Sequence, residues 1–593
     1  MRELTCRRCL HTWVPRQEEV RICPKCKSAW WDRPAPEGHE LLGIALRENQ
    51  AETIEAIRSA FTTGGKHTVF LDAPVGSGKS LVNMAAANVT AQTAYLTTPQ
   101  TLLVDQYKAD TDPGGKFEVF GARTVKGRAN YPCPYVRGLA DGDADATAEA
   151  APCTFLKHWP GGCGAKHGDT ECTGCPEYSR CPYYIAKHEA MAAPITITTM
   201  AYFILGIERS PNWLPRPLLI IDEAHGLPES LVEFFSVSVR EKTFPGIEFK
   251  RIPHPDLTQP IDEGLPYLLR ELPSYIQRQE ETLKRLIDAA ENHLPPSDED
   301  MKAISSQKRL VDRCHRVHTA LTTAGVEWIH TYDTGSSEHK WRPVDIAPFM
   351  EDIWESYDHV LLSSATFFDP ATLVRSLGLP ASWAVVPVPD TFPAERARVH
   401  LVGSVHLNRD RMDAELPKVL EELVRIAALH PDERGVIHCN SYKVKNYIDE
   451  RLKELPEEFR GRVAFHGRGK DRNDGLNRWL QDGRANSIFV AVSMSEGLDL
   501  VGDQARWQVI IKAPYPNLGD PWVLRRKARG DNWYPQQAVT NILQSCGRVM
   551  RSKDDRGVTY ILDRSATALL SWNWKDLPAW FRSRASQTSG RPS

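Results

Sequence analysis

A glycine-rich loop that ends in lysine and serine is the first feature of the sequence suited to chemistry. Residues Ala73 to Ser80 read APVGSGKS and stand between an apolar run and a helix-forming stretch. Glycines such as Gly76 and Gly78 let backbone amides turn toward phosphate oxygens, whose charge the start of the helix favours. Lys79 would contact the β- and γ-phosphates, and the Ser80 hydroxyl would bind Mg²⁺. The loop therefore predicts an ATP and Mg²⁺ site rather than a plain glycine turn.

Two carboxylates follow a second apolar run. The run PLLII ends in Asp222 and Glu223, which Ala224 and His225 follow. The carboxyl edge of a parallel sheet is where ligands bind in α/β folds. Asp222 would hold Mg²⁺ through water, and Glu223 would orient and deprotonate the attacking water. The start of a surface helix is the alternative, but the preceding strand and the upstream phosphate loop favour catalysis.

Two arginines near the C-terminus supply positive charge. The segment QSCGRVMR covers residues 544–551 and places Arg548 and Arg551 three residues apart. At that spacing they share one face of a helix. They can stabilise transition-state charge on a γ-phosphate held by another part of the chain. A solvated basic helix face is the alternative, and the two upstream motifs favour catalysis.

Four cysteines near the N-terminus have the spacing of a metal site. Two C-x2-C pairs, separated by thirteen residues, are formed by Cys6, Cys9, Cys23 and Cys26. In a cytosolic chain, grouped cysteines indicate metal rather than disulfides, and four thiolates suit tetrahedral Zn²⁺. We therefore expect a zinc ribbon over residues 1–34, which either contacts nucleic acid or has a protein-docking or purely structural role.

The composition limits the class of protein. A chain of 593 residues suggests roughly four domains. With 73 Lys and Arg against 76 Asp and Glu, the net charge is −3, which excludes a simple basic coat for DNA but not a locally positive groove. No apolar run approaches the ~20 residues that span a bilayer, and the N-terminus lacks the apolar segment of a secretory signal. We expect a cytoplasmic protein with no membrane partner.

Two sheets are needed to position the chemical groups. Short continuous apolar runs, typical of parallel strands buried on both faces, alternate with helical stretches in two blocks. The predicted strands are 67–73, 93–98, 195–199, 217–223 and 359–365 in the first block, and 435–440, 487–492, 508–513 and 557–563 in the second. Residues 228–345 instead carry apolar positions at a 3.6-residue period, which predicts a short helical insertion.

Together the motifs resemble those of superfamily 2 helicases. In order, they are Ala73–Ser80, Asp222–His225, Ser364–Thr366, Glu496–Asp499 and Gln544–Arg551. More narrowly, the chain resembles the DinG/XPD family of iron–sulfur DNA helicases. The narrower resemblance rests on Lys126–Cys133 (KGRANYPC), Cys181–Tyr184 (CPYY), the DEAH and QSCGRVMR segments, and the weaker match of Arg47 and Gln50 ahead of the phosphate loop.

The resemblance implies an α/β architecture of two RecA-like P-loop motor domains with two insertions in the first. The implied order is a zinc ribbon (1–34), motor domain 1 (40–125, 191–227 and 346–395), an iron–sulfur domain (126–190), a helical arch (228–345), motor domain 2 (396–572) and a flexible tail (573–593). ATP and Mg²⁺ would bind between the motors. The resemblance also places Gln50 and Asp499 at the nucleotide and adds Gln544 to the catalytic group.

The family further implies a [4Fe–4S] cluster, which requires four converging thiolates. Six cysteines are available: Cys133, Cys153, Cys163, Cys172, Cys175 and Cys181. Cys133 and Cys181 carry the flanking sequences of the family. Cys172 and Cys175 are favoured slightly over Cys153 and Cys163 for the other two ligands, and a zinc site with the same thiolates is the alternative.

The function implied is an ATP-dependent DNA helicase or translocase that moves 5′ to 3′ on single-stranded DNA, in repair, replication or recombination. Its partners would be single-stranded DNA and forked or overhanging duplexes, with the motor acting as a monomer. Alternatives are an RNA helicase, a translocase that does not unwind, and a motor subunit of a phage or CRISPR-associated complex recruited through the zinc ribbon. The basic run 525–529 is a candidate DNA-backbone contact, although a solvated charge run is favoured.

Overall fold

The structure is a computed structural model of the whole chain. It describes residues 4–5, 12–14, 40–74, 76–138, 145–149, 151, 153, 175–248, 252, 264–291, 297–388, 393–467, 471–492, 500, 502–547 and 555–587. The zinc-ribbon cysteines lie outside these ranges. Across the described parts of the chain, no helix is long and apolar enough to cross a membrane.

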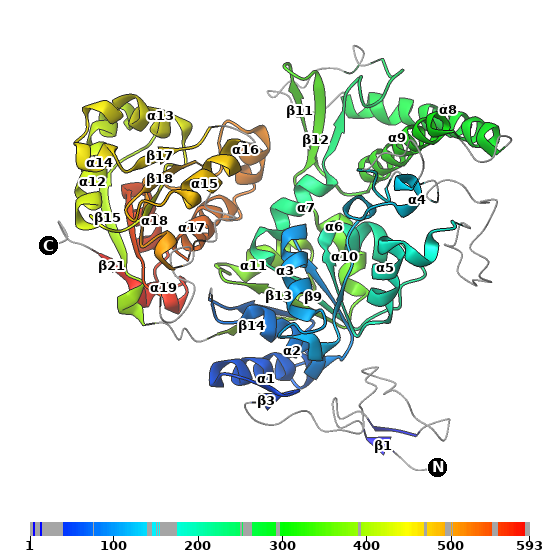
Figure 1. The fold of residues 1–593 in the computed structure, drawn as a ribbon, viewed down its shortest axis with the longest axis horizontal. Helices are drawn as coiled ribbons and strands as arrows, with labels where there is room; N and C mark the ends of the chain where they lie inside the picture. The colour runs from blue at the N-terminus through cyan, green and yellow to red at the C-terminus, as the bar shows by residue number, and fades with distance from the viewer. Residues whose placement is uncertain are drawn as a thin grey trace.

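The first sheet of the described chain is parallel and has seven strands (Figure 1). Their order is β14 (Trp383–Pro387), β5 (Thr68–Asp72), β13 (His359–Ser364), β9 (Leu218–Asp222), β6 (Ala94–Thr98), β8 (Ile195–Thr199) and β7 (Arg123–Thr124). The strands read as continuous apolar runs because helices cover both faces. The helices α1 (Glu48–Thr62), α2 (Lys79–Thr90) and α3 (Thr101–Thr111) pack on one face, and α7 (Leu227–Phe235) and α10 (Ala347–Glu355) pack on the other.

Strand β13 occupies the middle of this sheet although it follows both insertions in the chain. It pairs with β5 on one side and β9 on the other, with Ser364 opposite Asp72 and Ser363 opposite Asp222. The Ala73 amide also donates to the Ser364 carbonyl at 2.8 Å. This register brings the phosphate loop, the DEAH segment and the residues after Ser364 to one edge of the sheet.

A second parallel sheet, also of seven described strands, forms the other motor domain. Its order is β17 (Val463–Phe465), β18 (Ile488–Ala491), β16 (Gly435–His438), β19 (Trp507–Ile510), β20 (Val558–Asp563), β15 (Val399–Val405) and β21 (Ala585–Gln587). One face packs against α12 (Met412–Leu429) and α13 (Tyr442–Arg451), and the other against α17 (Trp533–Cys546) and α18 (Arg564–Trp572). In Figure 1 this domain runs from yellow to red beside the blue-to-green first motor.

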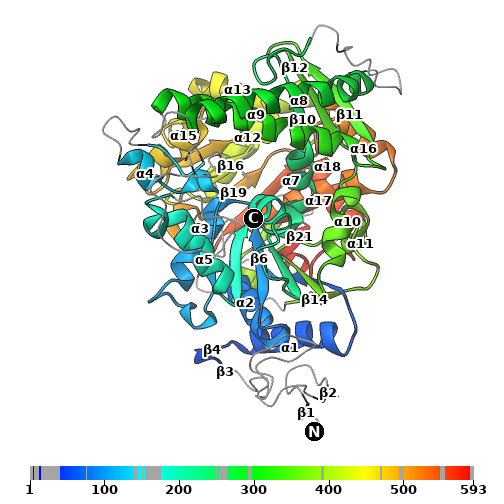
Figure 2. The same ribbon diagram turned by 90° about the vertical axis from the view of Figure 1, so that its right-hand side faces the viewer.

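The insertion between β9 and β13 is neither short nor wholly helical. Two long helices, α8 (Gly264–Glu291) and α9 (Asp298–Thr322), pack side by side and project from the first motor (Figures 1 and 2). Three strands form their base: β10 (Val237–Val239), β12 (Glu338–Pro343) and β11 (Trp328–Asp333). We call these three strands the arch foot. The prediction of a purely helical insertion was wrong because β12 buries alternate residues, including Trp341, at a period of two.

The prediction of a flexible tail from residue 573 was also wrong for its first half. Residues 579–584 form α19, and β21 adds a strand beside β15. Phe581 and Trp580 lie in the second motor's core and are 0% and 7% exposed. This apolar pair anchors a segment that otherwise reads as polar.

Gly435 in β16 lies where the core of the second motor leaves no room for a side chain. A Cβ atom at this position would lie 2.2 Å from Cε2 of the fully buried Trp507 ring. We expect Gly435→Ala to lower the free energy of unfolding by about 1–3 kcal/mol, since overpacking forces side chains and backbone to shift. Urea unfolding followed by circular dichroism measures this. Gly483→Ala, where a Cβ would meet no atom within 4 Å, is the matched control, and equal stability of the two variants would contradict the packing argument.

Candidate functional site

The phosphate loop links β5 to α2 and has the backbone that its glycines permit. Gly76 and Gly78 adopt φ values of 81° and 86°, in the left-handed region that favours glycine. Gln50 on α1 reaches the loop, because its Nε2 donates to the Ser77 carbonyl at 3.0 Å. A Cβ on Gly78 would lie 2.4 Å from the same Nε2 atom. The predicted nucleotide residues Gln50, Gly76 and Gly78 therefore form one unit.

Lys79 and Glu223 meet at the edge of the sheet. Lys79 Nζ lies 2.7 Å from Glu223 Oε1, and His225 Nδ1 lies 3.3 Å from Glu223 Oε2. Burial would raise the pKa of Glu223, but the charge of Lys79 and the contacts of His225 hold it far below its ordinary value. Glu223 also has a φ of 51°, a conformation uncommon outside glycine, which directs the residue away from strand geometry. Glu223 is thus an ionised carboxylate beside the phosphate loop, as a general base requires.

Asp222 is held on both sides by hydrogen bonds. Its Oδ2 accepts from the Tyr107 hydroxyl at 2.9 Å, and its Oδ1 accepts from the Glu223 amide at 3.0 Å. Burial raises the pKa of Asp222, and the neighbouring charge of Glu223 adds to this effect. The Tyr107 hydroxyl also accepts from Asn83 Nδ2 of α2 at 3.5 Å. Tyr107 therefore connects the helix that follows the phosphate loop to Asp222, and a lone tyrosine on α3 gives no sequence signal for this role.

A polar chain connects this site to the second motor. His225 Nδ1 lies 2.9 Å from Ser364 Oγ, and the Ser364 hydroxyl also accepts from the Thr366 amide. Gln544 on α17 donates from Nε2 to Thr366 Oγ1 at 3.3 Å. The Glu223 contact with His225 therefore continues to Gln544 through the two hydroxyl residues. The other predicted residues of this group, Asp499, Arg548 and Arg551, lie outside the described residues.

Four of the six central cysteines line one enclosed cavity. They are Cys133, Cys153, Cys175 and Cys181, and the aromatic rings of Tyr178 and Tyr184 complete the wall. Cys163 and Cys172 lie outside the described residues. Sequence reasoning favoured Cys172 and Cys175 beside Cys133 and Cys181, and for Cys172 this stays a prediction. Among the described residues, Cys153 lines the cavity with Cys133, Cys175 and Cys181. Residues 146–148 pair with the backbone of residues 131–133, the segment that carries Cys133.

The four thiols of the cavity are a donor set for more than one metal group. Among the described residues, no group of three or more metal-ligating side chains has the geometry of a formed metal site. Four thiolates are the ligands of both a tetrahedral zinc ion and a [4Fe–4S] cluster. The residues that line the cavity therefore fit either group.

Arg128 is the charged neighbour of the cysteine cavity. Its Nη1 lies 3.7 Å from Cys153 Sγ, its Nη2 donates to the Tyr184 hydroxyl at 3.0 Å, and its guanidinium stacks over Tyr183. Burial raises the pKa of the Cys175 thiol to about 12. The Cys175 thiol therefore keeps its proton unless a metal displaces it, and metal binding at this thiol would release that proton.

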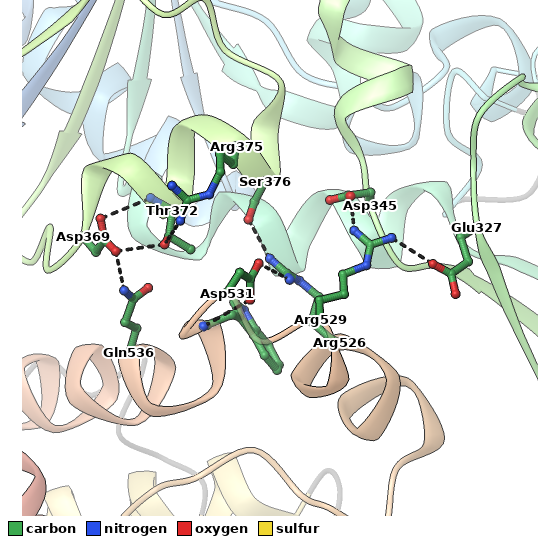
Figure 3. A network of polar contacts seen from close by, with 11 residues as sticks. Glu327, Asp345, Asp369, Thr372, Arg375, Ser376, Arg526, Arg529, Asp531 and Gln536 are labelled. Atoms are coloured by element: carbon green, nitrogen blue, oxygen red, sulfur yellow. Dashed lines mark hydrogen bonds and ion pairs between the residues drawn. The ribbon is translucent and has the colours of Figure 1, made fainter.

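The basic run 525–529 is partly solvated and partly packed against the first motor. It lies on α16 (Pro521–Ala528) and just beyond it, where the arginines contact carboxylates and a serine of the first motor and arch foot (Figure 3). Arg525, Lys527 and Arg529 are exposed, as the favoured interpretation of a solvated charge run expects. Arg526 is the exception at 4% exposed, because sequence does not show which elements face a helix.

Family models match two segments of the chain. A helicase C-terminal domain model matches residues 423–584, within the second sheet and its helices. The DEAD_2 model matches residues 172–244, which include Cys175, Cys181 and the Asp222–His225 segment. The matches thus fall on both motor domains.

Similar curated proteins include helicases that align along most of this chain. The ATP-dependent DNA helicase YoaA of Escherichia coli K12 is 22% identical over 89% of this chain and 93% of its own length. The ATP-dependent helicase DinG of Mycobacterium tuberculosis H37Rv is 24% identical with the same coverage. A homologue of regulator of telomere elongation helicase 1 from Aedes aegypti is 27% identical over 37% of this chain. The chain spans only a quarter of that relative's length.

Solved structures show the same fold. A structure titled XPD helicase superposes with a TM-score of 0.58 at 16% identity, covering 92% of this chain and 100% of that chain. Xpd4 of S. tokodaii gives a TM-score of 0.51 at 15% identity, covering 88% and 97%. The two-sheet arrangement with its insertions is therefore an XPD-like fold.

Lys79 and Glu223 lie in contact but are expected to act in different steps, Lys79 in nucleotide binding and Glu223 in hydrolysis. We expect Lys79→Ala to lose ATP binding, because the loop loses its contact to the phosphates. Glu223→Gln should keep ATP binding but hydrolyse it about 10²- to 10⁴-fold more slowly, since the amide cannot accept a proton from water. Fluorescent-nucleotide titration and phosphate release measure the two steps. Glu55→Gln on α1 is the control, and normal hydrolysis by Glu223→Gln would contradict the assignment.

Proposed function

We propose that this chain, an ATP-dependent DNA helicase of the DinG and XPD type, moves 5′ to 3′ along single-stranded DNA and separates the duplex ahead of it. The observation that carries the proposal is the junction of the two motors. There the Lys79–Glu223 pair of the first motor connects through His225 and Ser364 to Thr366, which Gln544 of the second motor contacts.

The geometry supports a mechanism of positioning and proton transfer. The amides and Lys79 of the phosphate loop bind the phosphates, and Mg²⁺ at Ser80 and Asp222 would neutralise their charge. Lys79 can bind either Glu223 or a phosphate oxygen, so phosphate binding frees the Glu223 carboxylate to deprotonate water. Gln544 and the arginines that follow it would approach the γ-phosphate from the second motor.

Hydrolysis would be coupled to movement through the same hydroxyl residues. Ser364 contacts His225 of the catalytic segment, and Thr366 contacts Gln544 of the opposite motor. Any change in the relative position of the motors must therefore alter contacts beside Glu223. Grip on the DNA would be mainly to phosphates, and for that reason it would be salt-dependent and weakly sequence-specific.

The proposal includes a [4Fe–4S] cluster held by Cys133, Cys153, Cys175 and Cys181. Its support is the shared cavity, the position of Arg128 beside Cys153 and the resemblance to the DinG/XPD family. The cluster would supply a structural cross-link between the segments that carry these four cysteines. A zinc site at Cys6, Cys9, Cys23 and Cys26 is also proposed, on the sequence spacing alone.

The identity of the four ligands is testable by metal content. We expect Cys153→Ser and Cys175→Ser to lose iron and the broad absorption near 400 nm, because each removes one wall of the cavity. Cys163→Ser and Cys172→Ser should keep both. Iron and zinc are measured by elemental analysis of anaerobically purified protein. Loss of iron from Cys172→Ser with retention in Cys153→Ser would restore the ligand set favoured by the sequence, and colourless wild-type protein with zinc and no iron would exclude the cluster.

Direction of movement is testable with two substrates of opposite polarity. We expect ATP-dependent unwinding of a duplex with a 5′ single-stranded overhang and none of the same duplex with a 3′ overhang. Lys79→Ala should lose unwinding and ATP hydrolysis together, whereas Cys133→Ser should lose unwinding more than hydrolysis. A gel-based strand-displacement assay measures this. Unwinding only from a 3′ overhang would refute the direction, and an RNA duplex serves to compare substrates.

A further inference from the structure

Helix α16 belongs to the second motor by chain order but packs into the core of the first. Trp522 and Val523 are 7% and 6% exposed and lie in the same hydrophobic cluster as Met350 and Trp354 of α10. Trp522 Nε1 donates to the Pro343 carbonyl at 2.7 Å, at the end of β12 in the arch foot. The helix is therefore buried against two parts of the molecule outside its own domain.

Ion pairs surround this buried tryptophan. Arg342 of β12 makes a bidentate ion pair with the Asp520 carboxylate, and its guanidinium lies over the Trp522 ring. Arg525 and Arg529 both contact Glu327 beside the arch foot. The other partners in the first motor are Asp345, which contacts Arg529, and Ser376, which accepts from Arg526 at 2.9 Å (Figure 3).

The carboxylates of these pairs are stabilised in their charged form. Partial burial opposes ionisation of Asp520, but the hydrogen bonds and charge of Arg342 prevail and lower its pKa. Partial burial also opposes ionisation of Glu327, but its hydrogen bonds to Arg525 and Arg529 and their charges prevail and lower the pKa of Glu327. A single exposed pair contributes little to stability, whereas several pairs around a buried ring fix one orientation. These contacts therefore determine how α16 sits on the arch foot.

Helix α17 continues this attachment into the core of the second motor. Its first residue, Trp533, packs edge-to-face on Trp522 at 5.4 Å and lies in the first motor's cluster. Ala538 and Ile542, further along the same helix, lie in the second motor's core. Gln536 contacts Asp369 of the first motor between these two regions. Helix α17, which carries Gln544, thus packs against the cores of both motors.

On its other side, the arch foot contacts α7, the helix that follows the catalytic segment. Lys340 of β12 lies 2.8 Å from Glu233 of α7, the helix that follows Asp222–His225. In Figures 1 and 2 the foot lies above α7, with α16 to one side of it. One antiparallel strand, β12, therefore contacts α7 of the first motor through Lys340 and the second motor through Arg342.

We propose that α16 and the arch foot form a fixed pivot about which the second motor turns when ATP closes the cleft. Arg342, Asp520 and Glu327 are positioning residues of this pivot: they act through α17, which sets the approach of Gln544 and the following arginines to the phosphates. The pivot also keeps the arch foot at a fixed position relative to α16 through the ATP cycle. The inference rests on the proposed function only in taking ATP as the ligand that closes the cleft.

Distances across the pivot and across the cleft provide the direct test. Fluorophores attached through a genetically encoded keto amino acid avoid the thirteen native cysteines. One pair of labels replaces the exposed residues Thr334 and Ala528, across the pivot, and another replaces Glu52 and Asn446, on opposite motors. With a non-hydrolysable ATP analogue, we expect energy transfer to change for the pair on opposite motors and to stay constant across the pivot. An equal change in both pairs would overturn the proposal.

Charge exchange tests the positioning role. We expect Arg342→Asp and Asp520→Arg each to slow DNA-stimulated ATP turnover on the order of 10- to 100-fold, as displaced catalytic groups do. Affinity for the fluorescent nucleotide should stay unchanged, because the phosphate loop lies in the first motor. The double variant should recover most of the lost turnover. Lys308→Asp, which breaks a pair within α9 alone, is the matched control.

Unchanged turnover in both single variants, or no recovery in the double variant, would overturn the positioning role. If a single variant does not fold, the distance measurement still decides, because it leaves Arg342 and Asp520 intact. The proposed function fails separately: a chain that shows the expected distances but unwinds no DNA keeps the pivot and loses the helicase assignment.

Discussion

The placement of one late strand determines the geometry on which the rest of the structure depends. Strand β13 enters the sheet between β5 and β9 after more than a hundred inserted residues, and its parallel hydrogen bonds fix Ser364 opposite Asp72 and Ser363 opposite Asp222. Because ligands bind at the carboxyl ends of parallel strands, the three segments meet at one edge. Without this register, the contact of His225 with Ser364 could not form, and the polar chain from Glu223 to Gln544 would be broken.

The motors are joined by a shared core as well as by the nucleotide cleft. Relative domain motion is the default where interfaces are small and polar, but Trp522 and Trp533 extend the first motor's hydrophobic cluster into the chain of the second. A cleft that opens beside such a joint favours rotation over separation. The arch foot contacts the same joint, which gives the inserted arch a physical connection to both motors.

The cysteine cavity shows how a small domain can depend on a cofactor. The described residues around the cavity contribute few large apolar side chains, and their buried cluster consists mainly of tyrosines and cysteines. Thiols whose pKa burial raises are poor ligands until a metal displaces their protons, so metal loading and packing of this region are coupled.

The sequence alone determined the chemistry of the nucleotide site and the two-sheet plan. Gly78, Lys79, Asp222 and Glu223 are contiguous motifs whose spacing already demands a strand, a turn and a helix, and buried parallel strands read as unbroken apolar runs. Only the tertiary structure decided which of the described cysteines share a cavity, that Tyr107 donates to Asp222, and that Arg525, Arg526 and Arg529 face Glu327, Asp345 and Ser376. The physical reason is distance along the chain. Local sequence encodes backbone and burial patterns, whereas the partner of a thiol or a guanidinium is set by how separate elements pack.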